Sequence, residues 1–313
     1  MTLILSEKDV EGLLDMDGVV AAVEEAFRRK GLGEAENYMR TRTRGASSVL
    51  NVMHANLPYL GRAGLKAYLS SKSGTKFVVV LFDAADSTPL AVMGADMLGR
   101  FRTGAASAVA TKYLYREASG TVAIFGSGRQ ALTQALALRS VMSVDEVRLW
   151  SPNDAHREAF ARALAEKGFR ARACGSPEEA LRGAVVATTI TSSREPFLDG
   201  AALGGVAHAN ICGGNVPAHA EISADAVASF QAVVVDDLPQ AKFEYGDLVR
   251  AAQVGKFSWD SAIELGAVVA GRPVPEGRTL FKSGGAAIED VAVASALYEA
   301  ARAASGFPDV RLT

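Results

Sequence analysis

Residues 121–138 read TVAIFGSGRQALTQALAL and give the strongest indication of the fold class. Five strand-forming residues run into a glycine-rich turn, after which apolar residues recur at helical spacing. The turn itself, from Gly126 to Ala131, is a GxGxxA motif. Placed between a strand and a helix, this motif is typical of a dinucleotide-binding βαβ unit.

Several residues of the glycine turn each have their own expected role. Gly126 permits the tight turn, Gly128 lets the backbone approach a pyrophosphate, and Ala131 allows the helix to pack closely on the strand. Free N–H groups at the start of the helix attract phosphates. The alternative is a tight turn that binds nothing. The cofactor-binding residues predicted here are Gly126, Ser127, Gly128, Arg129 and Gln130.

The end of the next predicted strand, EVRLW, bears on which dinucleotide is bound. An Asp or Glu at this position hydrogen-bonds the ribose 2′-OH of NAD. The strand ends instead in Ser151 and Asn153, so the charge that would exclude a 2′-phosphate is absent. Ser151, Asn153, His156 and Arg157 could together hold such a phosphate, although Asp154 opposes this. We therefore predict an NAD(P) cofactor and favour NADP(H) over NAD(H).

Predicted strands alternate with helices through the C-terminal half of the chain. The strands are TVAIF, EVRLW, FRARAC, AVVATTIT, VAHANIC, AVVVDDL and TLFK. Apolar strands separated by helices indicate a parallel sheet with crossover helices. We predict the α/β fold class, with a Rossmann-type doubly wound parallel sheet as the NAD(P)-binding domain in residues 117–286.

The N-terminal third follows a different pattern. Residues 6–31 have helical spacing, with Ser6 and Asp9 placed as a capping box. The period becomes two in residues 39–94, which predicts four or five antiparallel strands, and a helix is predicted at 101–115. The Ala-rich C-terminal helix has no sheet partner of its own. We therefore predict a discontinuous α+β domain from residues 1–116 and 287–313.

Composition excludes several classes of function. The 313 residues are 49% hydrophobic, which is enough for about two domains with large cores. A formal net charge of -2 with mixed signs argues against nucleic-acid binding. The chain starts without a signal-peptide pattern and has no run of about 18 apolar residues, so we expect a soluble cytoplasmic protein away from membranes. Cys174, Cys212 and the histidines have no metal-ligand spacing, so no metal site is predicted.

Several motifs occur in one order along nearly the whole chain. They are GLKAY around Lys66, FRTGAASAVATKYL, GSGRQA, TTITSS, NICGGNVP and FKSGGAAIEDVAVA. In these motifs the chain resembles the ornithine cyclodeaminase and mu-crystallin family. The resemblance implies a homodimer whose N-terminal domain binds substrate, forms the dimer and is closed by the C-terminal helix. It also implies hydride exchange between a nicotinamide and the carbon that bears a carboxylate and a nitrogen.

Three cations fall where the family places its substrate-binding cluster: Arg40, Lys66 and Arg102. An arginine fork can hold a carboxylate through two parallel hydrogen bonds. Lys66 has apolar neighbours, so we expect a lowered pKa and choose it as the catalytic residue for proton transfer to the substrate nitrogen. In the run RTRTR, Arg42 or Arg44 is an alternative to Arg40, because alternate strand residues share a face.

Further cofactor contacts are expected from the resemblance and from the strand ends. Arg102 and Thr103, taken as the start of a helix, would offer N–H groups to the cofactor phosphates. The threonines of TTITSS follow a strand at its carboxyl end, where open parallel sheets bind ligands. Small residues precede the C-terminal helix and would let the backbone approach the nicotinamide. The predicted residues of this group are Arg102, Thr103, Thr189, Thr191, Cys212, Gly213, Ser283 and Gly284.

The chain departs from the family pattern at Asn215. Cyclodeaminases of the family carry an Asp at this position, and that Asp moves the proton at the amine. An amide cannot accept a proton, and loss of a positioned base slows a reaction about 10²- to 10⁴-fold. We predict that Asn215 orients the substrate without proton transfer, and that a small 2-imino or 2-amino acid is the substrate, pyrroline-2-carboxylate being an example. His219 is an alternative base nearby.

Two alternative functions stay open at this point. One is an ornithine cyclodeaminase, which forms proline and ammonia from ornithine with catalytic NAD. The other is a protein that binds NADPH without catalysis, as in lens-crystallin recruitment within the same family.

Overall fold

The computed structural model describes residues 1–304 and 306–312, and the chain divides into two compact units. The first unit comprises Met1–Arg102 and Ala286–Thr313, and the second comprises Thr103–Gly285. Ser305 and Thr313, which fall within the predicted range 287–313, lie outside the described residues. The domain boundaries at 116–117 and 286–287 stay predictions.

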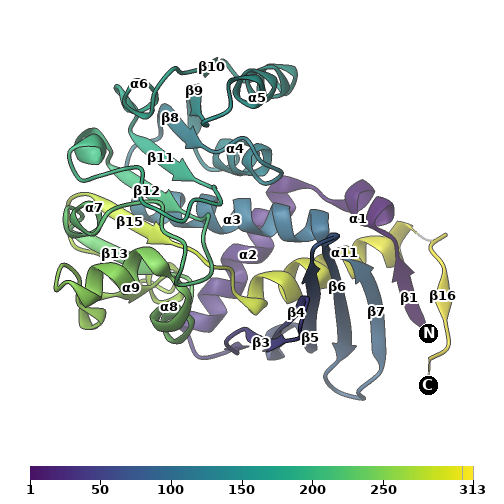
Figure 1. Ribbon diagram of the computed structural model, residues 1–313. Coiled ribbons are helices and arrows are strands. Elements are labelled where there is room, and N and C mark those ends of the chain that lie inside the picture. The colour runs from purple at the N-terminus through teal and green to yellow at the C-terminus, as the bar shows by residue number, and fades with distance from the viewer. Residues whose placement is uncertain (305, 313) are drawn as a thin grey trace. The chain divides into compact units, whose positions relative to one another are not determined.

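The second unit is built on a parallel sheet of eight strands in the order β10-β9-β8-β11-β12-β15-β13-β14 (Figure 1). From β8 the chain first runs outward through β9 and β10, then returns to the other side of β8 with β11. Ligands of open α/β sheets bind at such a switch point. The strands are β8 (Ser119–Phe125), β9 (Ser143–Trp150), β10 (Ala171–Ala173), β11 (Val186–Thr189), β12 (His208–Ile211), β13 (Ala232–Val235), β14 (Ile263–Glu264) and β15 (Thr279–Lys282). The predicted Rossmann-type α/β class is confirmed.

Both faces of this sheet are buried. Along β8, Val122 and Ile124 belong to one apolar cluster, whereas the alternate residues Ala123 and Phe125 belong to another. Strands buried on both faces read as continuous apolar runs, which is why they stood out in the sequence. The connecting helices are α4 (Ala131–Arg139), α5 (Asp154–Glu166), α6 (Pro177–Leu181), α7 (Ala224–Ala228), α8 (Leu238–Glu244), α9 (Gly246–Gln253) and α10 (Leu265–Val269), with 3-10 turns η2 (Ala202–Gly205) and η3 (Trp259–Ser261).

The first unit holds a mixed sheet in the order β16-β1-β7-β6-β5-β4-β2, with β3 paired to β4. Five antiparallel strands lie within residues 39–94, as the period of two predicts. Three further strands were not predicted, because β2 and β16 are only two residues long and β1 joins β7 in parallel. The strands are β1 (Thr2–Leu5), β2 (Glu36–Asn37), β3 (Thr41–Arg44), β4 (Ser48–Leu57), β5 (Arg62–Ser71), β6 (Gly74–Asp83), β7 (Pro89–Gly94) and β16 (Asp309–Val310).

Helices cover one face of this sheet. The C-terminal helix α11 (Ala287–Ala304) packs against α2 (Met16–Gly31) and against β4, β5 and β6. A Cβ on Gly64 of β5 would lie 3.2 Å from Val291 Cγ2, so this glycine lets the helix approach the sheet. The remaining elements are α1 (Glu7–Leu13), which begins with the predicted Ser6–Asp9 capping box, and the 3-10 turn η1 (Pro58–Leu60).

Helix α3 (Asp96–Leu114) begins five residues earlier than the sequence predicted. The carboxylate of Glu7 accepts hydrogen bonds from Asp96 N (3.2 Å) and Met97 N (2.5 Å) and so caps the helix. Arg102 and Thr103 therefore lie in the second turn, where each N–H bonds to a carbonyl four residues earlier. The expectation that their N–H groups are helix-terminal phosphate ligands was wrong. No described helix is long and apolar enough to cross a membrane.

Candidate functional site

The glycine turn of the second unit has the geometry of a phosphate cradle. Gly126 has φ +108°, and a Cβ there would lie 2.7 Å from the carbonyl oxygen of Ile190, so only glycine fits. A Cβ on Gly128 would meet nothing within 4 Å, which leaves open space beside this exposed backbone. Arg129 is exposed, and Gln130 is the N-cap of α4. The turn thus fits a dinucleotide pyrophosphate.

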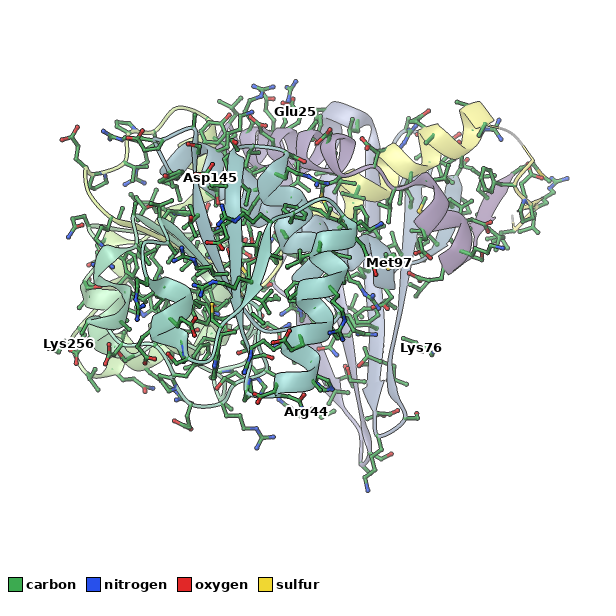
Figure 2. All side chains as sticks on the ribbon, turned by 90° about the horizontal axis from the view of Figure 1, so that it is seen from above. Glu25, Arg44, Lys76, Met97, Asp145 and Lys256 are labelled. Atoms are coloured by element: carbon green, nitrogen blue, oxygen red, sulfur yellow. The ribbon has the colours of Figure 1, made fainter. Side chains whose placement is uncertain are left out.

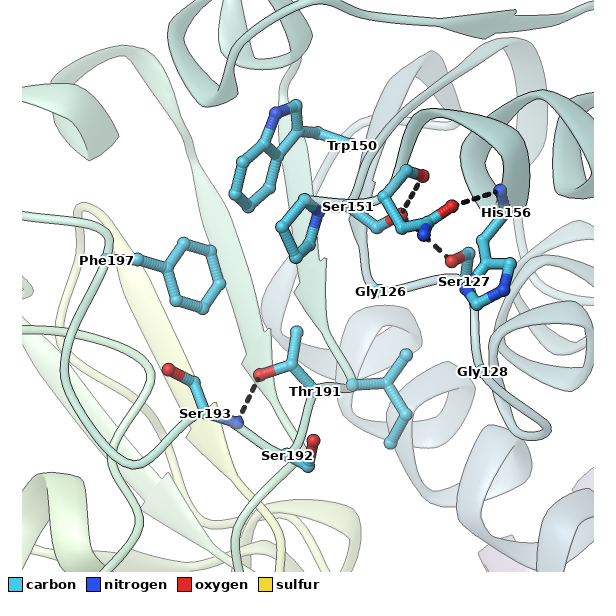
Figure 3. Close-up of a pocket in the computed structure, with 13 residues that line it drawn as sticks. Gly126, Ser127, Gly128, Trp150, Ser151, His156, Thr191, Ser192, Ser193 and Phe197 are labelled. Atoms are coloured by element: carbon cyan, nitrogen blue, oxygen red, sulfur yellow. Dashed lines mark hydrogen bonds between the residues drawn. The ribbon is translucent and has the colours of Figure 1, made fainter.

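A cavity of about 370 Å³ lies against this turn (Figure 3). The glycine turn and the end of β9 form one part of its wall, and residues 190–193 form another. The rings of Trp150 and Phe197 also line it, with centroids 5.8 Å apart. Aromatic walls beside polar groups are common in cofactor pockets, so this cavity suits the adenosine part of a dinucleotide.

The polar residues after β9 are largely bonded to one another. Ser127 donates its hydroxyl to Ser151 Oγ at 2.9 Å, and Asn153 caps α5 by accepting from His156 N at 2.9 Å. Arg157 donates to the Ser151 carbonyl at 2.7 Å and lies 2.8 Å from an Asp154 carboxylate oxygen. No acid occupies position 151, but Arg157, which is bonded to the Ser151 carbonyl, already pairs with Asp154.

The loops that follow β11 and β12 are tied together by one carboxylate, that of Glu221. It accepts hydrogen bonds from the Thr189 hydroxyl, the Thr191 hydroxyl, Thr191 N and Gly213 N, each at 2.7 Å. Glu221 and Thr189 are fully buried. The sequence predicted the two threonines and Gly213 as cofactor residues but gave no role to Glu221.

A buried ion pair stands next to this carboxylate. Asp247 Oδ1 accepts from Glu221 N at 2.6 Å, and Asp247 Oδ2 lies 2.8 Å from Lys282 Nζ. Burial alone would lower the pKa of Lys282, but Asp247 and Glu221 outweigh it and raise that pKa. Burial raises the pKa of Glu221, against the opposing charge of Lys282. The lysine therefore stays charged and offsets the two acids.

The loop after β15 wraps around a second buried carboxylate, that of Asp236. Its Oδ2 accepts from the Ser283 hydroxyl and Gly284 N, both at 2.9 Å, and from Gly285 N at 2.8 Å. A Cβ on Gly284 would lie 2.2 Å from the Tyr245 ring, so no larger residue fits. The predicted residues Ser283 and Gly284 are thus fixed by Asp236 and Tyr245.

The loop after β12 carries the remaining predicted residues of this unit. Cys212 is buried with its Sγ 3.2 Å from Ser107 Oγ, and burial raises the pKa of the thiol to about 12. Asn215 and His219 are both half-buried in this loop. On α3, Thr103 is buried and its carbonyl accepts from the Ser107 hydroxyl at 3.4 Å.

In the first unit, Lys66 and Arg102 are held by two acids at the start of α11. Lys66 Nζ lies 2.6 Å from Asp290 Oδ1, and the same oxygen accepts from Arg102 Nε at 3.0 Å. Arg102 Nη1 donates to Glu289 Oε2 at 2.7 Å. Both acids are fully buried and Lys66 is 2% exposed. These bonds hold two cations at fixed positions, where they can bind a carboxylate.

The charge state of Lys66 is shifted toward neutrality. Burial lowers its pKa to about 8, helped by Arg102 and Arg40 and opposed by Asp290. An ammonium with a pKa in this range can donate a proton near neutral pH. Among the three candidate arginines, Arg40 is 6% exposed, Arg42 is half-buried, and Arg44, labelled in Figure 2, is exposed. Burial therefore favours Arg40 as the third cation.

Sequence reasoning missed six charged residues of these clusters. A signal was available for Lys282, which is a lone charge between the apolar TLF and the small residues SGG, because such a charge has to be paired when it is buried. The missed residues are Glu221, Asp236, Asp247, Lys282, Glu289 and Asp290.

Residues 1–304 and 306–312 contain no group of three or more His, Cys, Asp or Glu side chains that could hold a metal ion. His208 is fully buried, with Nδ1 2.8 Å from Thr279 Oγ1 and Nε2 3.1 Å from Asn210 Oδ1. Burial lowers its pKa to about 4. This histidine is neutral and structural.

Comparison with known sequences gives a match over nearly the whole chain. The profile of the ornithine cyclodeaminase/mu-crystallin family matches residues 1–305. An alanine dehydrogenase from Archaeoglobus fulgidus is 35% identical over 311 residues, which cover 95% of this chain and 94% of the dehydrogenase.

Solved structures give the same match in three dimensions. The Δ1-pyrroline-2-carboxylate reductase of Thermococcus litoralis, solved with NADH and L-proline, has a TM-score of 0.91 and 29% identity, covering 99% of this chain and 100% of the reductase. An archaeal alanine dehydrogenase dimer with bound NAD has a TM-score of 0.90 and 32% identity, covering 100% of this chain and 99% of that one.

Proposed function

Because the chain belongs to the ornithine cyclodeaminase/mu-crystallin family, we propose that it is an NAD(P)-dependent oxidoreductase that reduces small 2-imino acids to 2-amino acids. The observation that carries the proposal is the buried lysine of the first unit. Lys66 is fixed by Asp290 beside Arg102, with a pKa of about 8. Such a group suits proton transfer to nitrogen next to a site for a carboxylate.

The cofactor role belongs to the second unit. A bound NAD(P)H supplies the hydride that adds to the imine carbon. The glycine turn would hold its pyrophosphate, since Gly128 leaves the backbone exposed and α4 begins three residues later, at Ala131. The loops fixed by Glu221 and Asp236 would hold the nicotinamide end, because they follow the carboxyl ends of neighbouring parallel strands.

The first unit supplies the groups for the substrate. Arg40 and Arg102 would hold the carboxylate of the imino acid, as cations suited to paired hydrogen bonds. Lys66 would give its proton to the imine nitrogen as the hydride reaches the carbon. The product amine then gains one hydrogen on carbon and one on nitrogen, which balances the reduction of the C=N bond.

Asn215 separates this reaction from cyclodeamination. Its amide would orient the substrate but cannot accept a proton from an amine. Oxidation of ornithine needs such a base, whereas imine reduction needs only a proton donor, and Lys66 is available for that. The pyrroline-2-carboxylate reductase neighbour supports a cyclic imine, and the alanine dehydrogenase relative supports an acyclic one. Both belong in the substrate panel.

For the cofactor, we propose that NADPH is accepted at least as well as NADH. The absence of an acid at Ser151 supports this, because nothing at that position repels a 2′-phosphate. Asp154 opposes it by pairing with Arg157. The two solved neighbours described above carry NADH and NAD, so the comparison of the two cofactors is a necessary measurement.

We also propose that the protein is a homodimer formed through the sheet of the first unit. The face of β4 and β5 opposite Lys66 is partly uncovered, with Leu50 41% and Leu69 46% exposed on paired positions and the polar His54 exposed on the same face. The alanine dehydrogenase neighbour is described as a dimer. Light scattering at two protein concentrations should give twice the chain mass, and a monomer at both would contradict the proposal.

The activity test is a panel of imino acids with NADH and NADPH in separate reactions. We expect oxidation of the cofactor with pyrroline-2-carboxylate or with pyruvate plus ammonia, and no ammonia from ornithine with NAD. Ammonia and proline from ornithine would instead support the cyclodeaminase alternative. Cofactor binding without turnover on every imine would support the crystallin-like alternative.

A further inference from the structure

Glu221 is a buried acid that the proposed reaction does not use. It lies between β12 and α7, is 0% exposed, and its two carboxylate oxygens each accept two hydrogen bonds. Two of the four donors are backbone N–H groups, of Thr191 and Gly213, which can only donate. The arrangement therefore matches a carboxyl group and not an amide of the same shape, whose NH₂ would face one of these N–H groups.

The threonine hydroxyls of this segment are directed to Glu221. Thr189 and Thr191 each donate their single O–H to it at 2.7 Å. The Thr191 oxygen also accepts from Ser193 N at 3.1 Å, as drawn in Figure 3. These hydroxyls are thus already used as donors, and what they contribute to a ligand is the placement of the loop that lines the cavity.

Close packing sets the distance between the two loops. A Cβ on Gly213 would lie 2.3 Å from Glu221 Oε1 and 2.3 Å from the Thr191 carbonyl oxygen. The carboxylate thus occupies the space next to the backbone of both loops. Any residue with a different charge or length at 221 has to move at least one of them.

The main chain of Glu221 adds a third connection. Its carbonyl accepts from Phe197 N at 3.0 Å, and the Phe197 ring lines the cavity beside the glycine turn. Its N–H donates to Asp247, which in turn pairs with Lys282 at the end of β15. One residue is therefore bonded to both strand-end loops and to the wall of the adenosine cavity.

We propose that Glu221 is a positioning residue for the cofactor, which fixes the loops after β11 and β12 in their binding geometry. This inference rests on the proposed function, since it requires that the second unit binds a dinucleotide. Glu221 itself touches neither the substrate nor the reacting atoms. Asp247 holds it in place by accepting from its backbone N–H, and Lys282 supplies the opposing charge.

The test is Glu221→Gln, which keeps the shape and replaces one accepting oxygen by an NH₂ group that faces two donors. We expect the Kd of NADH and NADPH, from fluorescence titration, to rise at least about tenfold, because hydrogen bonds to a charged group are lost. The KM for the cofactor should rise in parallel. The KM for the imine should change less than about threefold, because Lys66 and Arg102 are untouched.

Two further variants keep the test decisive. Thr189→Val removes one of the four donors without changing the shape, and we expect about a threefold rise in cofactor Kd with normal folding. Glu146→Gln on β9 is the matched control, because it removes a largely buried carboxylate paired with Arg148 in the same unit but contacts neither loop. It should leave the cofactor Kd unchanged.

The outcomes separate this inference from the proposed function. Unchanged cofactor Kd in Glu221→Gln, or an equal loss in Glu146→Gln, overturns the inference. If Glu221→Gln does not fold, an unchanged Kd in Thr189→Val overturns it instead. A wild-type protein that binds NADH but reduces no imine overturns the proposed function alone, while the titrations still decide the inference. A wild-type protein that binds neither cofactor overturns both.

Discussion

The two units each bury a cluster of charges, and the clusters are built in opposite ways. In the first unit, Asp290 and Glu289 bind cationic side chains, those of Lys66 and Arg102. In the second unit, Glu221 and Asp236 bind mainly backbone N–H groups and hydroxyls of loops. Charges held by side chains can titrate and meet a ligand, whereas charges bonded to the backbone fix its shape. The two clusters are equally buried, but the first is suited to binding and proton transfer and the second to fixing loops.

The largest expected effect comes from removing the titrating cation. Lys66→Met should lower kcat for imine reduction about 10²- to 10⁴-fold, because the proton donor is lost while Asp290 keeps Arg102 as its partner. Cofactor Kd should stay as in the wild type. Lys76→Met is the control, since Lys76 is exposed on the adjacent strand β6 (Figure 2) and should leave kcat unchanged. Wild-type kcat in Lys66→Met would contradict the catalytic assignment.

In the second unit, the same kind of charge removal should act on stability. Asp247→Asn leaves Lys282 buried without its carboxylate, and we expect the free energy of unfolding to fall by about 3 to 5 kcal/mol. Urea unfolding measures this. Asp225→Asn breaks an exposed pair with Lys256 in the same unit and should cost less than about 1 kcal/mol. Similar losses in both variants would mean that the buried pair has no special role.

The pH profile distinguishes the clusters further. Lys66 has to be protonated to donate, so kcat/KM should be level below about pH 8 and fall above it, given the pKa of about 8. Asp290 raises that pKa, so Asp290→Asn should move the alkaline fall about one pH unit lower. Asp83→Asn, which loosens the partly exposed pair with Arg62, should not move it. If kcat/KM of Asp290→Asn falls at the same pH as in the wild type, Asp290 does not set the pKa of Lys66.

The smallest expected effect is on cofactor preference, and it comes from adding a carboxylate to the wall of the cavity at Ser151. Ser151→Asp should lower kcat/KM with NADPH relative to NADH at least about tenfold, because a carboxylate would repel the 2′-phosphate and accept from the 2′-OH. The ratio of the two values for wild type and variant is the measurement. Asn153→Asp, two residues further along the same wall, serves as a comparison of position. An unchanged ratio in Ser151→Asp would place the ribose elsewhere.

Local patterns predicted much of the molecule. The apolar strands of the second unit, its glycine turn and the antiparallel strands of the first unit all follow from periodicity and turn residues. The start of α3 could not be predicted from these patterns, because its cap is Glu7, which is 89 residues away from Asp96 in the chain. Helix starts are predicted from a Ser, Thr, Asp or Asn next to the helix, so a cap from a distant segment cannot be predicted in this way.

The candidate residues divide in the same way. Lys66 and Arg102 were found from residue type, neighbours and the family motifs. Their partner Asp290 was not, because 224 residues separate it from Lys66. Thr189 and Thr191 were found at a strand end, but the direction of their hydroxyls depends on Glu221, about 30 residues later. Choosing Arg40 over Arg44 also required burial, which RTRTR alone does not contain.

Sequence patterns were enough to predict the fold class, the glycine turn, the family and the positions of the main cations. Each of these depends on short-range order, on strand and helix periods, or on motifs that keep their order along the chain. The bonding partners of the buried charges, in contrast, follow from how the chain packs in three dimensions. Those partners come from distant segments, and a charge buried in an apolar interior has to find them wherever the fold places them.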